Sequence, residues 1–331
     1  MNQQITMSQS PILFLCGHRK GGTTMLNNLF DGHSQLSVYP VDINLLYGYF
    51  PKFNNPVNSE AELFERIRRV VFDDLAKLPQ LTAHIDFNQF ELNFVKYTLN
   101  KPLADMQIVL SALFDAYADL NPQKKSFKYH VAKETSIEMY AKEISTWFPN
   151  CKFIHLIRDP RDNFSAIKSG YKKKYQGYGD SEISLLFSVL FRNLWGLKVA
   201  EKNLTLLGED RYKILKFEDL VDNPESEMQS IASWLGINYE ENLLVPSICG
   251  VATAGNNFDK KEFSGISSAH VGKWSERITA EEAAIIEFVF ADELKRFGYE
   301  LTASNDEIVD SVSLFYKHFN YKYFYFDRFG S

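Results

Sequence analysis

The 331-residue sequence has little cysteine, no long apolar run and no excess of positive charge, and each absence excludes a class of protein. Its three cysteines, Cys16, Cys151 and Cys249, are far apart and odd in number, so we expect reduced thiols in a cytoplasmic protein. No apolar run approaches the roughly 20 residues that span a bilayer, and the N-terminus carries no apolar signal core. The net charge of −6 argues against a general nucleic-acid binder, whose domains are usually basic.

No spacing of the seven histidines is typical of a metal site, and the chain shows no internal repeat and no linker. We therefore expect no metal, and we predict a single domain over residues 10–300 with a helical insertion at about 54–125 that caps the acceptor site. An extension follows over residues 301–331. Its dense aromatics predict docking on the domain, or on a second copy of the chain, rather than contact with a membrane.

The most informative stretch is Pro11–Leu29. A short apolar run over Pro11–Cys16 predicts a buried parallel strand, and apolar residues at helical spacing over Thr23–Phe30 predict a helix. Between them, Gly17–Gly22 holds three glycines in six residues. A strand, a glycine-rich turn and a helix start together form a cradle for phosphate, because the first N–H groups of the helix point at the anion. The alternative is a glycine-rich turn without a ligand.

The spacing of Gly17 and Gly22 is that of a nucleoside-triphosphatase loop, G-x-x-x-x-G-K-[ST], but Thr23 stands in the place of the lysine. The lysine is instead Lys20, inside the loop, with Arg19 beside it. A lysine in that place favours a shorter anionic group than the β- and γ-phosphates of ATP.

A second unit of the same kind covers Lys152–Asp162. The apolar run Lys152–Ile157 predicts a strand, a polar turn follows it, and a helix is predicted from about Asn163. Arg158 then lies at the carboxyl edge of the strand, where open α/β sheets bind their ligands. The alternative for Arg158 is a structural salt bridge to an acid such as Asp162.

These motifs resemble those of sulfotransferases that use 3′-phosphoadenosine 5′-phosphosulfate (PAPS), of the bacterial type. R-K-G-G-T-T at residues 19–24 resembles the 5′-phosphosulfate loop, in wording closest to the glycan and heparan enzymes. F-I-H-L-I-R-D-P-R-D resembles the 3′-phosphate segment, in which an arginine and a serine eight residues later hold the phosphate. Arg158 fits the arginine, but Ala166 stands at the serine position and Ser165 one place earlier.

Two weaker motifs follow in the order of the family, and the resemblance covers about residues 10 to 300. K-F-E-D-L-V-D-N-P at residues 216–224 resembles an architectural segment. S-S-A-H-V-G-K-W at residues 267–274 resembles the segment that folds over the nucleotide, which implicates Ser268, Lys273 and Trp274. The alternative for this segment is a core tryptophan beside a surface lysine.

The resemblance implies a P-loop nucleotide-kinase-like α/β fold of three layers, with a central parallel sheet, and sulfonate transfer from PAPS to an acceptor hydroxyl or amine. Lys20 would neutralise the charge that grows on the leaving group. Asp42, which lies 22 residues after Lys20, has the spacing of the catalytic glutamate of glycan sulfotransferases and would be the base. Lys133 would orient the acceptor or keep Asp42 ionised. The residues implicated in binding the 5′-phosphosulfate are Arg19, Lys20, Gly21, Gly22, Thr23 and Thr24.

Several alternatives stay open at the level of sequence. Asp42 is also a candidate N-cap for a helix that starts at Ile43, and His18 and His130 are the next candidates for the base. The acceptor is a small molecule or a glycan. The rival functions are an ATP-dependent kinase or ATPase and a non-catalytic nucleotide-binding protein.

Overall fold

The computed structural model describes residues 10–44, 56–121, 127–174, 182–253 and 265–319. Its centre is a sheet of five parallel strands in the order β2-β3-β1-β4-β5, which confirms the α/β fold predicted from the sequence. Every residue of β1 is buried, as expected of a strand that is covered on both faces. The strands are β1 (Ile12–Gly17), β2 (Leu36–Asp42), β3 (Tyr129–Lys133), β4 (Lys152–Ile157) and β5 (Tyr212–Lys216).

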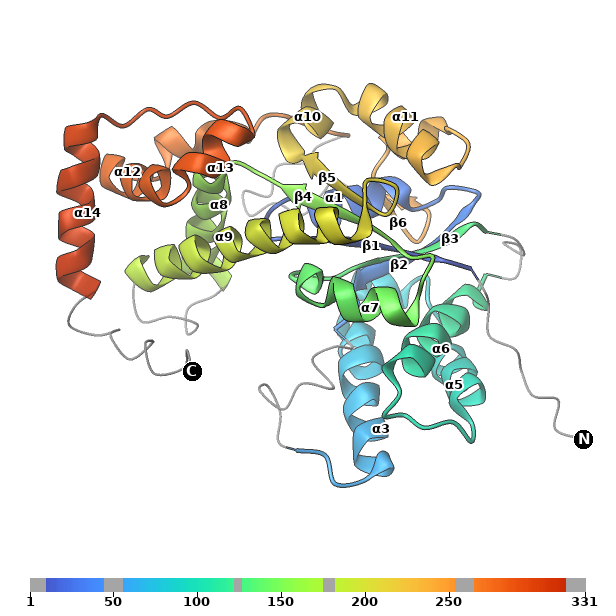
Figure 1. Cartoon of the computed structure of the whole chain (residues 1–331). Coiled ribbons are helices and arrows are strands. Elements are labelled where there is room, and N and C mark those ends of the chain that lie inside the picture. The colour runs from blue at the N-terminus through green and yellow to red at the C-terminus, as the bar shows by residue number, and fades with distance from the viewer. Residues whose placement is uncertain (1–9, 45–55, 122–126, 175–181, 254–264, 320–331) are drawn as a thin grey trace, which may run out of the picture.

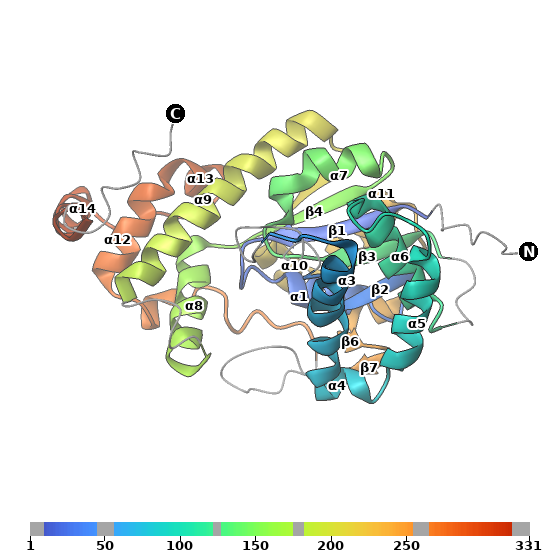
Figure 2. The ribbon, with the colours of Figure 1, turned by 90° about the horizontal axis from the view of Figure 1, so that it is seen from below.

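Helices cover both faces of this sheet (Figures 1 and 2). On one face, Phe14 and other β1 side chains pack against α3 (Glu60–Arg68), α5 (Phe87–Thr98), α6 (Met106–Ala118) and α7 (Ala141–Trp147). On the other face, Leu13 and Leu15 pack against a second group of helices. That group consists of α1 (Thr23–Phe30), α10 (Phe217–Asp222) and α11 (Pro224–Leu235).

A third cluster of buried side chains lies among the helices that follow β4. It joins α8 (Pro160–Lys174) and α9 (Glu182–Leu207) to α12 (Ala280–Val289) and α13 (Ala291–Arg296). The last helix, α14 (Asn305–Phe319), packs beside α12, so the start of the extension lies on the domain (Figure 1). The rest of the aromatic segment lies outside the described residues.

The helical insertion is less regular than its sequence predicts. Within the insertion, apolar residues repeat at helical spacing from Glu60 to about Leu78, which predicts one helix. In the structure this helix ends at Arg68, and a π-helical turn follows, η1 (Arg69–Asp73). Val71 and Phe72 within this turn are both buried, so packing on the core accounts for the wide turn. The other short elements are η2 (Leu75–Lys77), α4 (Pro79–Thr82), η3 (Ile137–Tyr140), η4 (Glu241–Leu244), β6 (Ser247–Ile248), β7 (Val251–Ala252) and η5 (Lys273–Glu276).

One prediction of a helix start is wrong. The helix after β4 begins at Pro160 rather than at about Asn163, and proline suits a first helical position because that N–H needs no partner. Within the residues that the structure describes, no helix has the length and apolar character needed to cross a membrane.

The register of the strands brings the polar segments of the sequence to one edge of the sheet. Leu15 of β1 lies opposite Lys133 of β3, and Gly17 lies opposite Leu156 of β4. Asp42, at the end of β2, is paired with Lys133. The segments that leave these strands therefore start side by side, which places their side chains in one site.

Candidate active site

The loop between β1 and α1 is shaped by close contacts that require glycine. A Cβ added at Gly17 would lie 2.4 Å from the carbonyl oxygen of Leu156, and one at Gly22 would lie 2.4 Å from the ring of Phe217. Both glycines also have positive φ, 134° and 105°. The glycine spacing noted in the sequence thus fits the loop tightly between β4 and α10.

The loop leads directly into the N-terminus of α1. Gly22 precedes α1, no side chain in the described part of the chain caps this helix, and the first turn contains no acid. Thr23 and Thr24 are its first residues. Free N–H groups and the positive end of the helix dipole form a site for an anion.

Lys20 adopts a left-handed backbone conformation, with a φ of 66°. For a residue with a side chain this conformation costs about 1–2 kcal/mol, and such strain gathers at functional positions. It is consistent with a loop that sets the Lys20 side chain in a particular place.

Arg158 contacts this loop directly. Its guanidinium donates to the carbonyl oxygen of Lys20, at 3.2 Å, and to that of His270, at 3.1 Å, and it lies 4.7 Å over the ring of Phe217. Burial lowers the pKa of Arg158 below its usual value, although the nearby Asp162 carboxylate opposes this shift. Its buried Nε atom has no hydrogen-bond partner within the described ranges. A buried cation with an unused donor suits a bound anion.

The start of α8 holds the first loop from one side. Asn163 donates from Nδ2 to the carbonyl oxygen of Arg19, at 2.8 Å, and its Oδ1 accepts from Nδ1 of His18, also at 2.8 Å. Burial lowers the pKa of His18 to about 4, so the ring is neutral near pH 7. A pKa this low makes His18 a weaker base than an ordinary histidine.

The same helix start holds the segment at residues 267–274. The carboxylate of Asp162 accepts from the backbone N–H groups of Gly272 and Trp274, at 2.6 and 2.9 Å. The ring of Trp274 lies 4.4 Å from the guanidinium of Arg161, and Lys273 pairs with Glu276 at the surface. The backbone of this segment therefore lies beside Arg158, while Trp274 packs into the protein.

Two further candidates sit differently from expectation. Ser165 lies in α8 with only 2% of its surface exposed. His130 is the register partner of Ile12 at the start of β1, and its Nε2 lies 3.3 Å from a carboxylate oxygen of Asp115, so His130 lies at the opposite end of the strands from the first loop. The proposal of His130 as an alternative base is therefore wrong. Ser268 is exposed on the segment that contacts Arg158.

Asp42 and Lys133 meet at the ends of neighbouring strands, where their charged groups form an ion pair of 2.7 Å. Asn44 follows with a left-handed φ of 53° and its N–H donates to the buried carboxylate of Glu134, at 2.7 Å. A helix that starts at Ile43 would need a right-handed φ at Asn44, so the alternative of Asp42 as the N-cap of that helix is wrong.

Sequence reasoning missed some residues of this site. Burial, and next the charge of Asp42, raise the pKa of Glu134 to about 8. Arg192 of α9 is exposed, donates to the hydroxyl of Ser136 at 2.9 Å, and lowers the pKa of His18 by its charge. Glu134 could have been suspected from the sequence because it directly follows Lys133. Arg192 lies within a long helical pattern, and nothing in the sequence around it indicates a role in the site.

Comparisons with known proteins agree with this geometry. A family model described as "Sulfotransferase family" matches residues 11–241. The chain is 21% identical over 320 residues to the omega-hydroxy-beta-dihydromenaquinone-9 sulfotransferase Stf3 of Mycobacterium bovis, covering 89% of this chain and 77% of that protein. It is 25% identical over 188 residues to carbohydrate sulfotransferase 1 of Homo sapiens, covering 50% of this chain and 43% of that protein.

Among solved structures, the sulfotransferase domain from the Synechococcus PCC 7002 olefin synthase has the same fold. It matches with a TM-score of 0.57 and 22% identity, and the match covers 91% of this chain and 99% of that domain. The sulfotransferase domain from the curacin biosynthetic pathway matches with a TM-score of 0.56 and 18% identity, over 88% and 99% of the two chains. The chain therefore belongs to the sulfotransferase family, and it is an enzyme that transfers a sulfonate group to an acceptor.

Proposed function

We propose that the sulfonate donor is PAPS and that it binds across the first loop and Arg158. The observation that carries this proposal is the hydrogen bond between the Arg158 guanidinium and the Lys20 carbonyl, which joins the two phosphate-binding segments of the sequence. The open start of α1 suits the 5′-phosphosulfate, and the buried guanidinium suits the 3′-phosphate. ATP has no 3′-phosphate to engage Arg158.

Each segment has a role in this proposal. Residues 19–24 bind the 5′-phosphosulfate, chiefly through backbone N–H groups at the start of α1. Residues 267–274 lie along the nucleotide, with Ser268 exposed toward solvent and Lys273 at the surface. Trp274 acts indirectly, because its ring is held by Arg161. Ser165 is buried in α8 and would have to act from within the helix.

In the reaction, an oxygen of the acceptor attacks the sulfur atom, and the bond from sulfur to the bridging oxygen breaks. The products are the sulfated acceptor and 3′,5′-ADP. Asp42 takes the proton of the acceptor hydroxyl, and Lys20 stabilises the negative charge that develops on the departing phosphate. Lys133, paired with Asp42, holds that carboxylate in place and orients the acceptor.

The acceptor that we propose carries a hydroxyl group. By their names, one relative acts on a hydroxylated menaquinone and another on carbohydrate, so a hydroxyl is what the two acceptors share. Carbohydrates come first in a screen, because the wording of the first loop is closest to that of the glycan enzymes. We further propose a cytoplasmic location, in line with the buried free thiols of Cys16 and Cys151.

A comparison of three nucleotides tests the donor. A ligand that binds the folded state raises the melting temperature, and we expect 3′,5′-ADP to raise it far more than AMP or ATP does. An equal or larger rise with ATP would support a kinase or ATPase instead. Labelled PAPS, incubated with separate pools of carbohydrates and hydroxylated lipids, then tests the transfer. A chain that binds 3′,5′-ADP but transfers no label to any pool, or to water, would be a non-catalytic nucleotide-binding protein.

A further inference from the structure

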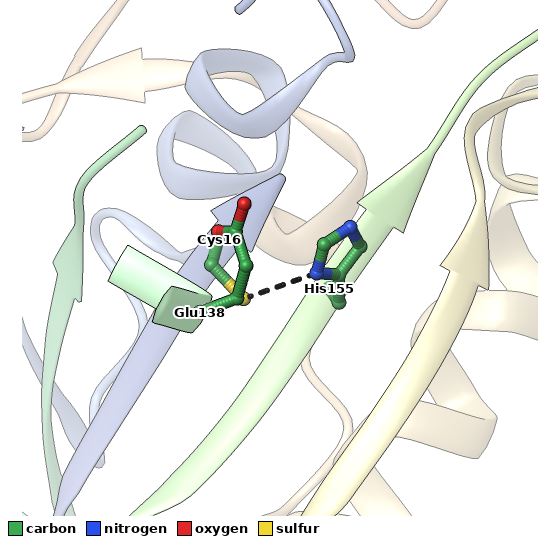
Figure 3. A group of neighbouring side chains, drawn as sticks. All are labelled: Cys16, Glu138 and His155. Carbon is green, nitrogen blue, oxygen red and sulfur yellow. Dashed lines mark hydrogen bonds between the residues drawn. The ribbon is translucent and has the colours of Figure 1, made fainter. Parts of the chain in front are cut away.

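Three polar side chains meet in the interior, directly below the first loop. Cys16 comes from the end of β1, Glu138 from η3 and His155 from β4 (Figure 3). They are 0%, 2% and 2% exposed. One ligand atom of each, the Cys16 sulfur, a Glu138 oxygen and a His155 ring nitrogen, lies within 4.8 Å of the other two. The catalytic scheme above uses none of them.

The distances in this cluster approach those of a tetrahedral zinc site. Bonds of about 2.3 Å to sulfur and about 2.0–2.1 Å to nitrogen place these two ligands about 3.6 Å apart at a tetrahedral angle. The Cys16 sulfur and His155 Nδ1 are 3.7 Å apart. The hydroxyl of Tyr212 lies 3.2 Å from His155 Nδ1 and 3.9 Å from the sulfur, so it borders the same cluster.

A second observation concerns one carboxylate oxygen of Glu138. Oε2 of Glu138 is buried and has no hydrogen-bond partner among the residues that the structure describes. Leaving such an atom unpaired is costly, and a metal ion would satisfy it. We propose that Cys16, Glu138 and His155 form a binding site for a divalent metal ion of the zinc type, with Tyr212 adjacent.

The charges of these groups suit a dication. Burial raises the pKa of the Cys16 thiol well above its usual value, so without a metal this thiol keeps its proton near neutrality. Burial raises the pKa of Glu138 to about 7, so this carboxyl group is only partly protonated there. Burial lowers the pKa of His155 to about 3, which leaves its ring neutral and able to bind a metal. On binding, the metal takes the place of the thiol proton and of the carboxyl proton where one is present, and each displaced proton goes to solvent. One thiolate and one carboxylate then neutralise the ion.

The ion would stabilise the base of the phosphate loop rather than take part in sulfonate transfer. Gly17, the first residue of the loop, directly follows Cys16, and its N–H stabilises the Glu138 carboxylate. Cys16 and His155 are also register partners on neighbouring strands. A bound ion would therefore tie β1, β4 and η3 together beneath the loop.

The experiment is expression of the full chain in minimal medium supplemented with Co²⁺, followed by absorption spectroscopy and metal analysis of the purified protein. Loading during synthesis is needed because the cluster is buried. We expect close to one Co²⁺ per chain and a thiolate-to-cobalt charge-transfer band. Cys16→Ser should lose the band. Cys151→Ser is the matched control, because Cys151 is equally buried but lies beside the cation of Arg211.

A second pair of variants guards against misfolding of Cys16→Ser. Glu138→Gln and His155→Gln should each lower the cobalt content at least tenfold. In protein grown with zinc, prolonged treatment with a chelator should lower the melting temperature of the wild type but not that of either variant. Wild-type protein without a thiolate band and without bound metal would overturn the proposal, and the cluster would then be a neutral hydrogen-bonded network. A band that disappears only in Cys151→Ser would also overturn it. The binding of 3′,5′-ADP is measured separately and can fail or succeed independently.

Discussion

Lys133 and Asp42 join the carboxyl ends of β3 and β2 through an ion pair whose nitrogen and oxygen are 2.7 Å apart. The Lys133 side chain is 4% exposed, whereas that of Asp42 is 39% exposed. The pair thus presents a carboxylate to the site while its cation stays buried. Two hydrogen bonds hold the chain that follows Asp42: the Ile43 N–H donates to the Lys133 carbonyl oxygen, and the Asn44 N–H donates to the Glu134 carboxylate. These contacts fix the carboxylate at the edge of the sheet where the first loop begins.

We predict that Lys20→Ala lowers kcat by about 100-fold or more while changing donor affinity little, because the ammonium acts mainly on charge that develops in the transition state. Lys20→Gly should lose kcat equally. It should be more stable than the alanine variant by about 1 kcal/mol, since glycine tolerates the φ of 66°. Steady-state kinetics and chemical denaturation measure the two effects. Lys96→Ala, at an exposed position on α5, is the control. A near-normal kcat in both Lys20 variants would exclude this role.

We predict that Arg158→Ala weakens binding of 3′,5′-ADP by roughly 1.5–3 kcal/mol and leaves AMP binding almost unchanged, because only 3′,5′-ADP has a 3′-phosphate. Calorimetric titration with both nucleotides measures the difference. Equal losses for the two nucleotides would show that Arg158 acts through its bonds to the Lys20 and His270 carbonyls.

Ser165→Ala in the same titration separates a phosphate ligand from a buried helix residue. With 2% of its surface exposed, Ser165 should contribute little, and we expect a change in 3′,5′-ADP binding of less than about 0.5 kcal/mol. A loss as large as that of Arg158→Ala, confined to 3′,5′-ADP, would place the serine on the 3′-phosphate.

Glu134 should make stability fall as the pH rises. Its pKa is raised to about 8 in the folded protein, first by burial, so between about pH 4.5 and 8 the folded chain holds a proton that the unfolded chain has released. Stability then falls by up to about 1.4 kcal/mol per pH unit in this window and levels off above it. Glu134→Gln should make the slope shallower in denaturation at pH 5 to 8, while Glu138, whose pKa burial raises to about 7, still contributes part of it. Glu143→Gln, at an exposed position on α7, should leave it unchanged. An unaltered slope in Glu134→Gln would contradict the raised pKa.

Local patterns in the sequence were enough to predict the strands and the turn that carry the binding motifs. The apolar runs over Pro11–Cys16 and Lys152–Ile157 are β1 and β4, and the glycines between β1 and α1 form the turn that their spacing predicts. The π-helical turn after Arg68 could not be predicted, because it depends on how Val71 and Phe72 pack against distant side chains.

The contacts that organise the site were beyond sequence reasoning, since they join residues far apart in the chain. The bond between Asn163 and His18 spans 145 positions, and that between Asp162 and Gly272 spans 110. The left-handed backbone of Lys20 also has no signal in the sequence, because lysine does not favour it. The motifs indicated which segments meet, and only the structure gave the hydrogen bonds between them.

The sharpest test of the chemistry is Asp42→Asn, which keeps the shape of the side chain and removes the base. We predict a fall in kcat of about 100-fold or more, with 3′,5′-ADP binding nearly unchanged, because the amide of asparagine cannot take the acceptor proton that we assign to Asp42. Loss of the pair with Lys133 leaves a buried cation, so the melting temperature should fall somewhat as well. Asp222→Asn, at an exposed position at the end of α10, is the matched control. Normal turnover by Asp42→Asn would show that another group takes the proton, and Glu134, which Asn44 contacts, would be next to test.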